Sequence, residues 1–289
     1  MPIPFVKMHG LGNDYVYVDG TRQPMVGVDL RVLARAMSDR HRGIGGDGLI
    51  LILPPRADVA ADVRMEMYNA DGSRGEMCGN GIRCVGRYAV QRLRLGRKEG
   101  GATRLMVETD RGVLRLDVHT SASRVTRVRV DMGRPILRPS EIPVRAEGER
   151  CVRETIEAGG RRLKMTCVSM GNPHAVFFVP DAGAVELERI GPLIERHDRF
   201  PARINAHFAQ ALGKGEVHMR TWERGSGATQ ACGTGACATL VAGVLEQRLS
   251  RQAVVHLPGG DLEVEWPDDD GPVFMTGPAE EVFEGEWRE

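Results

Sequence analysis

The sequence lacks an excess of either charge. Its 289 residues include 39 Lys and Arg against 39 Asp and Glu, so the formal net charge is zero. No basic stripe interleaved with aromatic residues stands out, and a nucleic-acid partner is therefore not indicated. No apolar run reaches the ~18 residues that a membrane-spanning helix needs, and no charged leader precedes an apolar stretch. We expect a cytoplasmic protein that binds a small molecule and contacts no membrane.

Cysteine is scarce, at six residues, and a cytosolic chain of this length needs no disulfide framework. We therefore expect all six to be reduced. Spacing typical of a metal site is missing, because Cys78 and Cys84 enclose five residues and Cys232 and Cys237 four, with no histidine cluster nearby. We expect no metal. A zinc-binding or other non-catalytic thiol protein stays as an alternative of another class, which zinc retained in purified protein would favour.

What the sequence does contain is a duplicated pattern. Cys78-Gly79-Asn80-Gly81 resembles Cys232-Gly233-Thr234-Gly235, and in each half an earlier pair, Gly12-Asn13 or Gly171-Asn172, leads into an apolar run. The two pairs and the two cysteines lie almost equally far apart along the chain, so a coincidence of Gly-rich turns is the less favoured explanation. The length also suits two domains. The pattern predicts a unit of strand, cysteine and helix that occurs twice.

Short apolar segments bounded by Gly, Pro or Asp predict strands, many of them antiparallel. They cover residues 15–18, 49–53, 63–67, 105–108, 113–118, 125–130, 163–168, 175–179, 217–221, 254–257 and 262–266. Helical spacing predicts a helix that Asp29 caps over 29–37, and helices over 81–93 and 235–249, just after the two cysteines. The turn at 132–135 predicts a domain boundary after residue 131.

Each of the two cysteines is predicted to begin a helix, where unpaired backbone N–H groups and the helix dipole favour a thiolate. The neighbouring glycines let backbone N–H groups approach a carboxylate closely. If both helices point at one carboxylate, Cys78 and Cys232 lie on opposite faces of its α-carbon. One thiolate removes the α-proton and the other thiol protonates the opposite face, which inverts the centre without a cofactor. The pattern predicts a racemase or an epimerase.

Two other interpretations of the cysteines are possible. They could be small buried residues that only pack, which is how we interpret Cys84 and Cys237 inside the following helices. In a single-cysteine hydrolase His174 would activate one thiol, but the second cysteine then has no role. Other polar residues beside the duplicated turns are candidates for the same site: Asn13, Asn69, Asn172, Asn205, Glu223 and Arg224.

The chain resembles the diaminopimelate epimerase family in stretches spread over nearly its whole length. They are KMHGLGNDY (7–15), RHRGIGGDG (40–48), YNADGS (68–73), MCGNGIRC (77–84), SMGNPH (169–174), ERG (223–225) and QACGTG (230–235). The resemblance implies a cofactor-independent isomerase of lysine and peptidoglycan biosynthesis, which converts LL-2,6-diaminopimelate to the meso form. A racemase or epimerase of the same fold that acts on another amino acid is the alternative.

The resemblance also implies an α/β fold with two pseudo-symmetric domains, each a mainly antiparallel, barrel-like sheet around a central helix. The first would cover 1–131 together with 276–289, which return to it, and the second 132–275. A cytoplasmic homodimer is implied as well. Two positions depart from the family. Where this chain has Gly48, some members have Gln, and where it has Ala228, many members have an acidic residue. We assign no contact to Gly48.

By the same resemblance, Cys78 and Cys232 are the acid/base pair and exchange roles with the stereoisomer bound. His174 and Glu223 are implied to tune or orient the thiols and the reacting ammonium. The reacting carboxylate would be held by backbone groups of Gly79, Asn80, Gly233 and Thr234. Further substrate contacts are implied for Asn13, Asn69, Asn172, Asn205 and Arg224. Arg224 suits the distal carboxylate, because its planar fork can donate two parallel hydrogen bonds.

Overall fold

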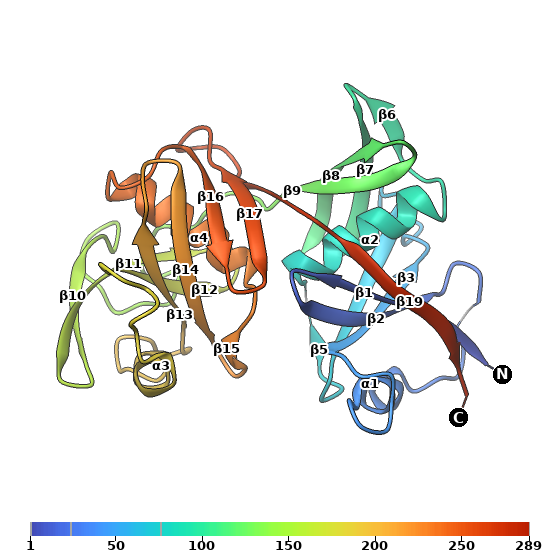
Figure 1. The fold of residues 1–289 in the computed structure, drawn as a ribbon, viewed down its shortest axis with the longest axis horizontal. Coiled ribbons are helices and arrows are strands. Elements are labelled where there is room, and N and C mark those ends of the chain that lie inside the picture. Colours follow the sequence, from blue (N-terminus) through green and yellow to red (C-terminus); the bar gives the residue numbers. More distant parts are fainter. Residues whose placement is uncertain (1, 24, 76, 289) are drawn as a thin grey trace. The chain divides into compact units, whose positions relative to one another are not determined.

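The computed structural model describes residues 2–288 except 24 and 76. Residues 1, 24, 76 and 289, which the sequence-based domains include, lie outside the described part. The chain forms two compact units, Met1–Val130 with Thr276–Glu289, and Asp131–Met275 (Figure 1). Each unit is a mainly antiparallel sheet packed around one long helix. The predicted α/β fold of two similar halves is confirmed.

The first unit contains two helices, α1 (Leu30–Ser38) and α2 (Gly79–Gln91), and α2 is the central one. Its strands are β1 (Ile3–Gly10), β2 (Asn13–Asp19), β3 (Gly48–Leu53), β4 (Val63–Asn69), β5 (Arg74–Gly75), β6 (Arg97–Glu99), β7 (Ala102–Thr109), β8 (Gly112–Ser121), β9 (Arg124–Asp131) and β19 (Glu280–Trp287). The short β18 (Phe274–Gly277) leads from the second unit into this one.

The second unit also contains two helices, α3 (Leu187–Glu195) and the central α4 (Gly233–Leu245). Its strands are β10 (Glu154–Ala158), β11 (Arg161–Ser169), β12 (Pro173–Phe178), β13 (Asn205–Ala211), β14 (Glu216–Glu223), β15 (Gly227–Thr229), β16 (Gln252–Leu257) and β17 (Gly260–Glu265).

Strand pairing follows the same order in both units. In the first, β1–β2 is antiparallel, β2–β3 parallel, β3–β4 antiparallel, β4–β7 parallel and β7–β8 antiparallel. In the second, β11–β12, β12–β13, β13–β14, β14–β16 and β16–β17 repeat that series of directions. The short β5 and β15 pair with β4 and β14, just before the central helix of each unit. The duplication inferred from the cysteine motifs therefore extends to the whole topology.

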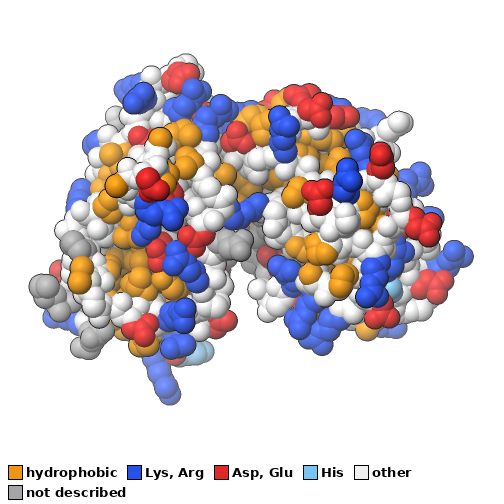
Figure 2. Space-filling view, turned by 180° about the vertical axis from the view of Figure 1, so that it is seen from behind, with side chains coloured by type: hydrophobic (Ala, Val, Ile, Leu, Met, Phe, Trp, Pro, Cys, Tyr) orange, Lys and Arg blue, Asp and Glu red, His pale blue; other side chains and the backbone are white. Residues whose placement is uncertain are grey.

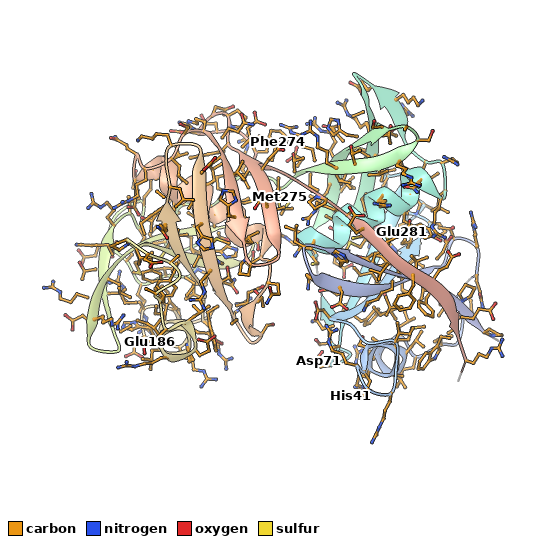
Figure 3. All side chains as sticks on the ribbon, viewed as in Figure 1. His41, Asp71, Glu186, Phe274, Met275 and Glu281 are labelled. Carbon is orange, nitrogen blue, oxygen red and sulfur yellow. The ribbon has the colours of Figure 1, made fainter. Side chains whose placement is uncertain are left out.

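The central helices are held by burial on nearly all sides. In α4 the side chains of Leu240 and Val241 are fully buried, and a helix that is apolar all round is one surrounded by protein. In α2 the guanidinium of Arg83 is fully buried and donates to the carbonyl of Pro278, over 2.9 Å. This bond ties the returning C-terminal segment to the helix. Glu281 on β19, labelled in Figure 3, adds an ion pair of 2.8 Å to Arg92 at the end of α2.

The sequence pattern did not predict three of the longer elements, and it misplaced the first residue of two helices. It did not predict β1, β13 or α3, and it placed the starts of α2 and α4 two residues too late. Helix α3 contains Pro192, which normally ends a helix, so its pattern was not recognised. Gly191 is needed there because a Cβ would lie 2.4 Å from a ring carbon of Trp222. Tertiary packing against that indole thus overrides the local signal.

On the face seen in Figure 2, both units carry both charges. Figure 2 shows acidic and basic side chains interspersed over each unit, as the equal totals of 39 and 39 lead one to expect. Of the helices in the described part of the chain, none combines the length and the apolar character that crossing a bilayer requires.

Candidate active site

Cys78 and Cys232 occupy equivalent positions. Each is the N-cap residue of its central helix, with extended backbone angles of φ −127° and ψ 119° for Cys78 and φ −120° and ψ 102° for Cys232. The backbone N–H of Gly81 donates to the sulfur of Cys78 over 3.3 Å. Both thiols therefore sit at the positive end of a helix dipole, as predicted. All six cysteines of the chain are thiols in this structure.

The two Gly-Asn pairs also match in backbone conformation. Gly12 and Gly171 have φ of 82° and 89°, the left-handed region that favours glycine. Each turn delivers an asparagine, Asn13 or Asn172, at or just before the strand that packs beside the central helix. The sequence repeat therefore has a geometric cause, because the same turn places the same side chain in both units.

In the first unit, Asn13 lies directly against the thiol. Its Oδ1 is 3.4 Å from the sulfur of Cys78 and 3.4 Å from Nδ2 of Asn80. Tyr15, two residues further along β2, is buried and hydrogen-bonds to both Cys78 and Asn13. Burial raises the pKa of Tyr15 well above its usual range, and the adjoining Cys78 raises it further, so the hydroxyl stays neutral.

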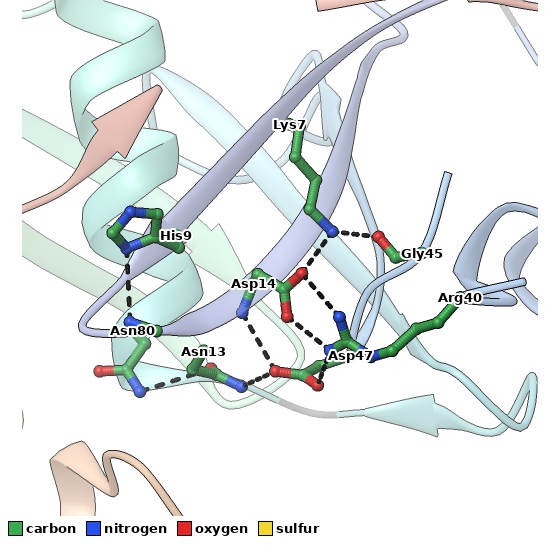
Figure 4. A network of polar contacts seen from close by, with 9 residues as sticks. Lys7, His9, Asn13, Asp14, Arg40, Gly45, Asp47 and Asn80 are labelled. Atoms are coloured by element: carbon green, nitrogen blue, oxygen red, sulfur yellow. Dashed lines mark hydrogen bonds and ion pairs between the residues drawn. The ribbon is translucent and has the colours of Figure 1, made fainter. Parts of the chain in front are cut away.

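A charged network supports Asn13 from behind (Figure 4). Nδ2 of Asn13 donates to Oδ2 of Asp47 over 2.6 Å, and Asp47 Oδ1 accepts from Arg40 over 2.9 Å. Asp14 pairs with Arg40 at 2.7 Å and with Lys7 at 2.6 Å. Burial disfavours the charge of Asp14, but hydrogen bonds from Arg40 and Lys7 outweigh burial and lower its pKa. The network fixes the turn that presents Asn13.

In the second unit, a row of hydrogen bonds leads to Cys232 from the core. Thr221 Oγ1 is 2.9 Å from His207 Nδ1, and His207 Nε2 is 2.8 Å from His174 Nδ1. His174 Nε2 lies 3.0 Å from Asn172 Oδ1. The Nδ2 of Asn172 donates to Thr234 over 3.3 Å, and the Thr234 hydroxyl is 3.7 Å from the sulfur of Cys232.

His207 is buried completely, and burial lowers its pKa to about 3, so it is neutral at physiological pH. Gly235 makes room for the ring, because a Cβ there would lie 2.3 Å from Cε1 of His207. The imidazole therefore rests against the first turn of α4, next to the thiol that caps it.

The thiol of Cys232 is only 4% exposed. Burial raises its pKa well above the usual range, and the neighbouring carboxylate of Glu223 raises it further. Hydrogen bonds from the Gly235 N–H and from Thr234 act in the opposite direction. Glu223 itself accepts from Thr229 Oγ1 over 2.5 Å, which holds the carboxylate beside the thiol.

Asn205 begins β13, and Arg224 follows the end of the neighbouring β14. The amide of Asn205 donates to the carbonyl of Pro173 over 2.8 Å and accepts from the Arg224 N–H over 2.9 Å. The Arg224 guanidinium donates to the carbonyl of Ala202 over 3.0 Å. Asn205 thus fixes the backbone from which the arginine projects.

The structure gathers the predicted site residues into one group in each unit. The first group is Asn13, Cys78, Gly79 and Asn80, with Asn69 on the adjoining turn, where its Nδ2 donates to Ser73 over 2.9 Å. The second is Asn172, His174, Asn205, Glu223, Arg224, Cys232, Gly233 and Thr234. Sequence reasoning missed the residues behind them: Lys7, Asp14, Tyr15, Arg40, Asp47, His207 and Thr221. Several stand inside the quoted motifs, which was the available signal.

Solved structures of other proteins share the fold of this chain. A hydroxyproline epimerase from Agrobacterium vitis matches with a TM-score of 0.70 and 16% identity, over 99% of this chain and 91% of that one. A probable proline racemase from Agrobacterium radiobacter K84 matches with a TM-score of 0.71 and 19% identity, over 99% and 93%. At these identities the likeness shows the fold alone, and this fold is one that racemases and epimerases use.

Sequence relatives give the family. The family model for diaminopimelate epimerase matches residues 5–137 and 166–282. Proteins named diaminopimelate epimerase from Desulforudis audaxviator and Methanococcus maripaludis are 52% and 48% identical over 283 and 282 residues, covering 98% of each chain. The chain belongs to the diaminopimelate epimerase family, and it is an isomerase.

Proposed function

We propose that the chain inverts one α-carbon of LL-2,6-diaminopimelate to give the meso form, by proton transfer to and from Cys78 and Cys232. The observation that supports this most is the pair of thiols, each the N-cap of a central helix with nearly the same backbone angles. Membership of the diaminopimelate epimerase family supplies the substrate. The reaction belongs to the biosynthesis of lysine and of peptidoglycan precursors.

The reacting carboxylate needs strong donors, and the start of each central helix offers them as backbone N–H groups. Gly79 and Asn80 provide them in α2, and Gly233 and Thr234 in α4. Unpaired N–H groups at a helix start are strong donors to an anion. Neutralising this carboxylate makes its α-proton easier to remove, because negative charge spreads onto the carboxylate as the proton leaves.

The proton steps balance without a cofactor. One cysteine, as thiolate, takes the α-proton and becomes a thiol, while the other thiol gives its proton to the opposite face and becomes a thiolate. After each turnover the protonation states of the two cysteines are exchanged. This is the protonation state that the reverse reaction, starting from the meso form, requires. His174 and Glu223 orient the groups around Cys232, as their contacts beside that thiol support.

Substrate choice rests on the distal end of the molecule. Arg224 pairs with the second carboxylate, while Asn69 and Asn205 complete its hydrogen bonds. Asn13 and Asn172 supply further substrate contacts. Lysine lacks that carboxylate, so the arginine would have no anion to bind. We expect the binding free energy of lysine to be weaker by roughly 1.5–3 kcal/mol. Diaminopimelate should therefore be preferred by at least about tenfold to a hundredfold. Arg224→Met should narrow that preference, and equal turnover of both by the unmodified protein would favour an amino-acid racemase of other specificity.

We also propose a homodimer in the cytoplasm. Two large apolar side chains of β19, Val282 and Phe283, are 56% and 48% exposed, which suits a surface that a second copy covers. The six cysteines are thiols, as is typical of a reducing compartment in which disulfides rarely form. Sedimentation of the unmodified protein and of the Val282→Asp variant tests the dimer. We expect the unmodified protein to sediment as a dimer and the variant as a monomer. A monomeric unmodified protein would contradict the proposal.

The direct test of the function is incubation of the purified protein with LL-diaminopimelate, followed by chiral chromatography of the isomers. We expect the meso form to accumulate to equilibrium. Cys84→Ala is a matched control, because Cys84 is a fully buried thiol of α2 whose pKa burial raises to about 11. This variant should retain conversion. Absence of conversion by the unmodified protein, with turnover of another amino acid, would remove the substrate assignment.

A further inference from the structure

Asp47 has no assigned role, yet its carboxylate sits at the centre of the network behind Asn13 (Figure 4). Oδ2 accepts from Asn13 Nδ2 over 2.6 Å and from the Asp14 N–H over 3.0 Å, while Oδ1 accepts from Arg40 over 2.9 Å. The backbone of Asp47 is fixed as well, since its N–H donates to the Asp14 carbonyl over 2.7 Å and its carbonyl accepts from Ala70 over 3.0 Å. The carboxylate is therefore held in one place.

An ionised carboxylate can only accept hydrogen bonds, whereas an amide donates at one end and accepts at the other. The 2.6 Å contact therefore decides which end of the Asn13 amide points toward Asp47. It must be the NH2 group, and the carbonyl oxygen is left 3.4 Å from the sulfur of Cys78. We propose that Asp47 is a positioning residue: it fixes the amide of Asn13 so that the carbonyl oxygen, and not the NH2 group, faces the thiol of Cys78.

The orientation matters for chemistry at that sulfur. A carbonyl oxygen accepts from an S–H group and so favours the thiol, while an NH2 group would donate to the sulfur and favour the thiolate. Asp47 thereby keeps Cys78 ready to give a proton, with the S–H held toward a defined acceptor. This inference rests on the proposed function for its relevance to turnover, but the orientation itself concerns the first unit alone.

The residues around this contact set the background for any pH measurement. Among the described residues, the titratable or charged side chains that face Asn13, Asp47 or Cys78, or lie on the turns beside them, are Lys7, His9, Asp14, Tyr15, Tyr17, Arg40, Arg83 and Cys84. They are the same in the wild type and in the variants below, so a difference between proteins reports the altered contact.

The experiment measures the rate of alkylation of Cys78 by iodoacetamide against pH, with peptide mass spectrometry to separate this thiol from the others. In Asp47→Asn the introduced amide turns its oxygen to Arg40, which can only donate, and its NH2 group toward Asn13, so the hydrogen bond from the Asp14 N–H is lost. The Asn13 amide then reverses, gives up the long 3.4 Å contact with Asn80 Nδ2, and donates to the sulfur. We expect the titration midpoint of Cys78 to fall and its alkylation below that midpoint to be about three- to tenfold faster.

Two further variants make the result specific. Asp110→Asn removes a carboxylate of the same unit that Arg74 pairs with over 2.7 Å, away from the thiol, and should leave the midpoint unchanged. Asn13→Ala removes the acceptor, so it should also lower the midpoint, and Asp47→Asn in that background should add little. If Asn13→Ala instead raises the midpoint, its NH2 group faces the sulfur and the proposal is wrong.

An equal shift from Asp47→Asn with and without Asn13 would mean that the carboxylate acts through its charge alone, which also overturns the proposal. Slow labelling of the buried Cys84 in the same samples shows that each variant is folded. The Asn13→Ala arm tests the proposal even if Asp47→Asn does not fold. Since alkylation needs no diaminopimelate, a failed conversion assay and a failed midpoint shift are separate results.

Discussion

The equivalent asparagines of the two units turn opposite ends toward their thiols, directly in the first unit and through Thr234 in the second. In the first unit the oxygen of Asn13 lies 3.4 Å from the sulfur of Cys78, and the NH2 group faces a carboxylate. In the second, the oxygen of Asn172 faces His174, and its NH2 group donates to Thr234, whose hydroxyl lies 3.7 Å from the sulfur of Cys232. The backbone was duplicated, but the hydrogen-bond polarity around the thiol was not.

The supporting residues differ in the same way. The first unit uses ion pairs: Lys7 and Asp14 form a largely buried one, and Arg40 adds exposed ones to Asp14 and Asp47. The second uses neutral groups in the core around His207. Surface ion pairs weaken with salt, whereas a buried neutral histidine is sensitive to acid. The fold repeat thus fixes where each thiol lies, while the residues behind the thiol differ between the two units.

The largest expected effect comes from removing either thiol. Cys78→Ala and Cys232→Ala should each lower kcat for diaminopimelate by about 10²- to 10⁴-fold, because one face of the α-carbon then has no proton carrier. Initial rates by chiral chromatography measure it. Near-normal turnover by one of the two would show that the halves do not share the reaction.

Acid should affect the second unit through His207. Its pKa is about 3 when folded and about 6.5 when unfolded, so the unfolded chain binds the proton more readily. The stability that depends on this neutral ring is present above pH 6.5 and is lost as the pH falls toward 3. Between pH 7.5 and pH 5 the loss is about 2 kcal/mol.

His207→Gln should remove that part of the pH dependence. Urea unfolding followed by tryptophan fluorescence, in a Trp287→Phe background, reports on the second unit, which contains Trp222 and Trp266, because Trp287 belongs to the first. The unfolding free energy of the variant should change less between pH 7.5 and pH 5 than that of the wild type. Parallel curves for the two proteins would mean that His207 is not neutralised by burial.

A smaller effect distinguishes two equivalent glycines. At Gly235 a Cβ would meet the fixed ring of His207 at 2.3 Å, and at Gly81 it would meet the flexible ends of Ile50 and Met65, at 2.6 and 3.2 Å. Gly235→Ala should therefore cost about 1–3 kcal/mol of unfolding free energy, and Gly81→Ala clearly less, because Ile50 can change rotamer. Thermal unfolding of both variants measures the difference, and equal losses would contradict this account of the ring.

The sequence revealed the repeat because its signals are local. A glycine at positive φ, an asparagine after it and a cysteine at a helix start are all short-range features, and both copies were found. Helix α1 was predicted for the same reason, since Asp29 accepts from the N–H groups of Arg31 and Val32. Long-range contacts left no comparable signal.

Asp47 and His207 show what could not be predicted. Asp47 was seen only as part of a matched motif, because its partner Asn13 is 34 residues away. His207 lies on β13, a strand that the sequence pattern did not predict. Its ring bonds to His174 on the parallel neighbour β12 and to Thr221 on the antiparallel neighbour β14. Such distant partners decide which group of a hydrogen bond donates and which accepts, so only the three-dimensional structure reveals it.

The central claim is that two thiols act on opposite faces of one carbon. It is tested most directly by the conversion of LL-diaminopimelate in heavy water, with mass spectrometry of substrate and product at early times. The incoming proton comes from a solvent-exchanged thiol, so new meso product should carry deuterium at the inverted carbon while unreacted substrate stays largely unlabelled. Early product that keeps the hydrogen of the substrate would point to a single shared base and would contradict the account.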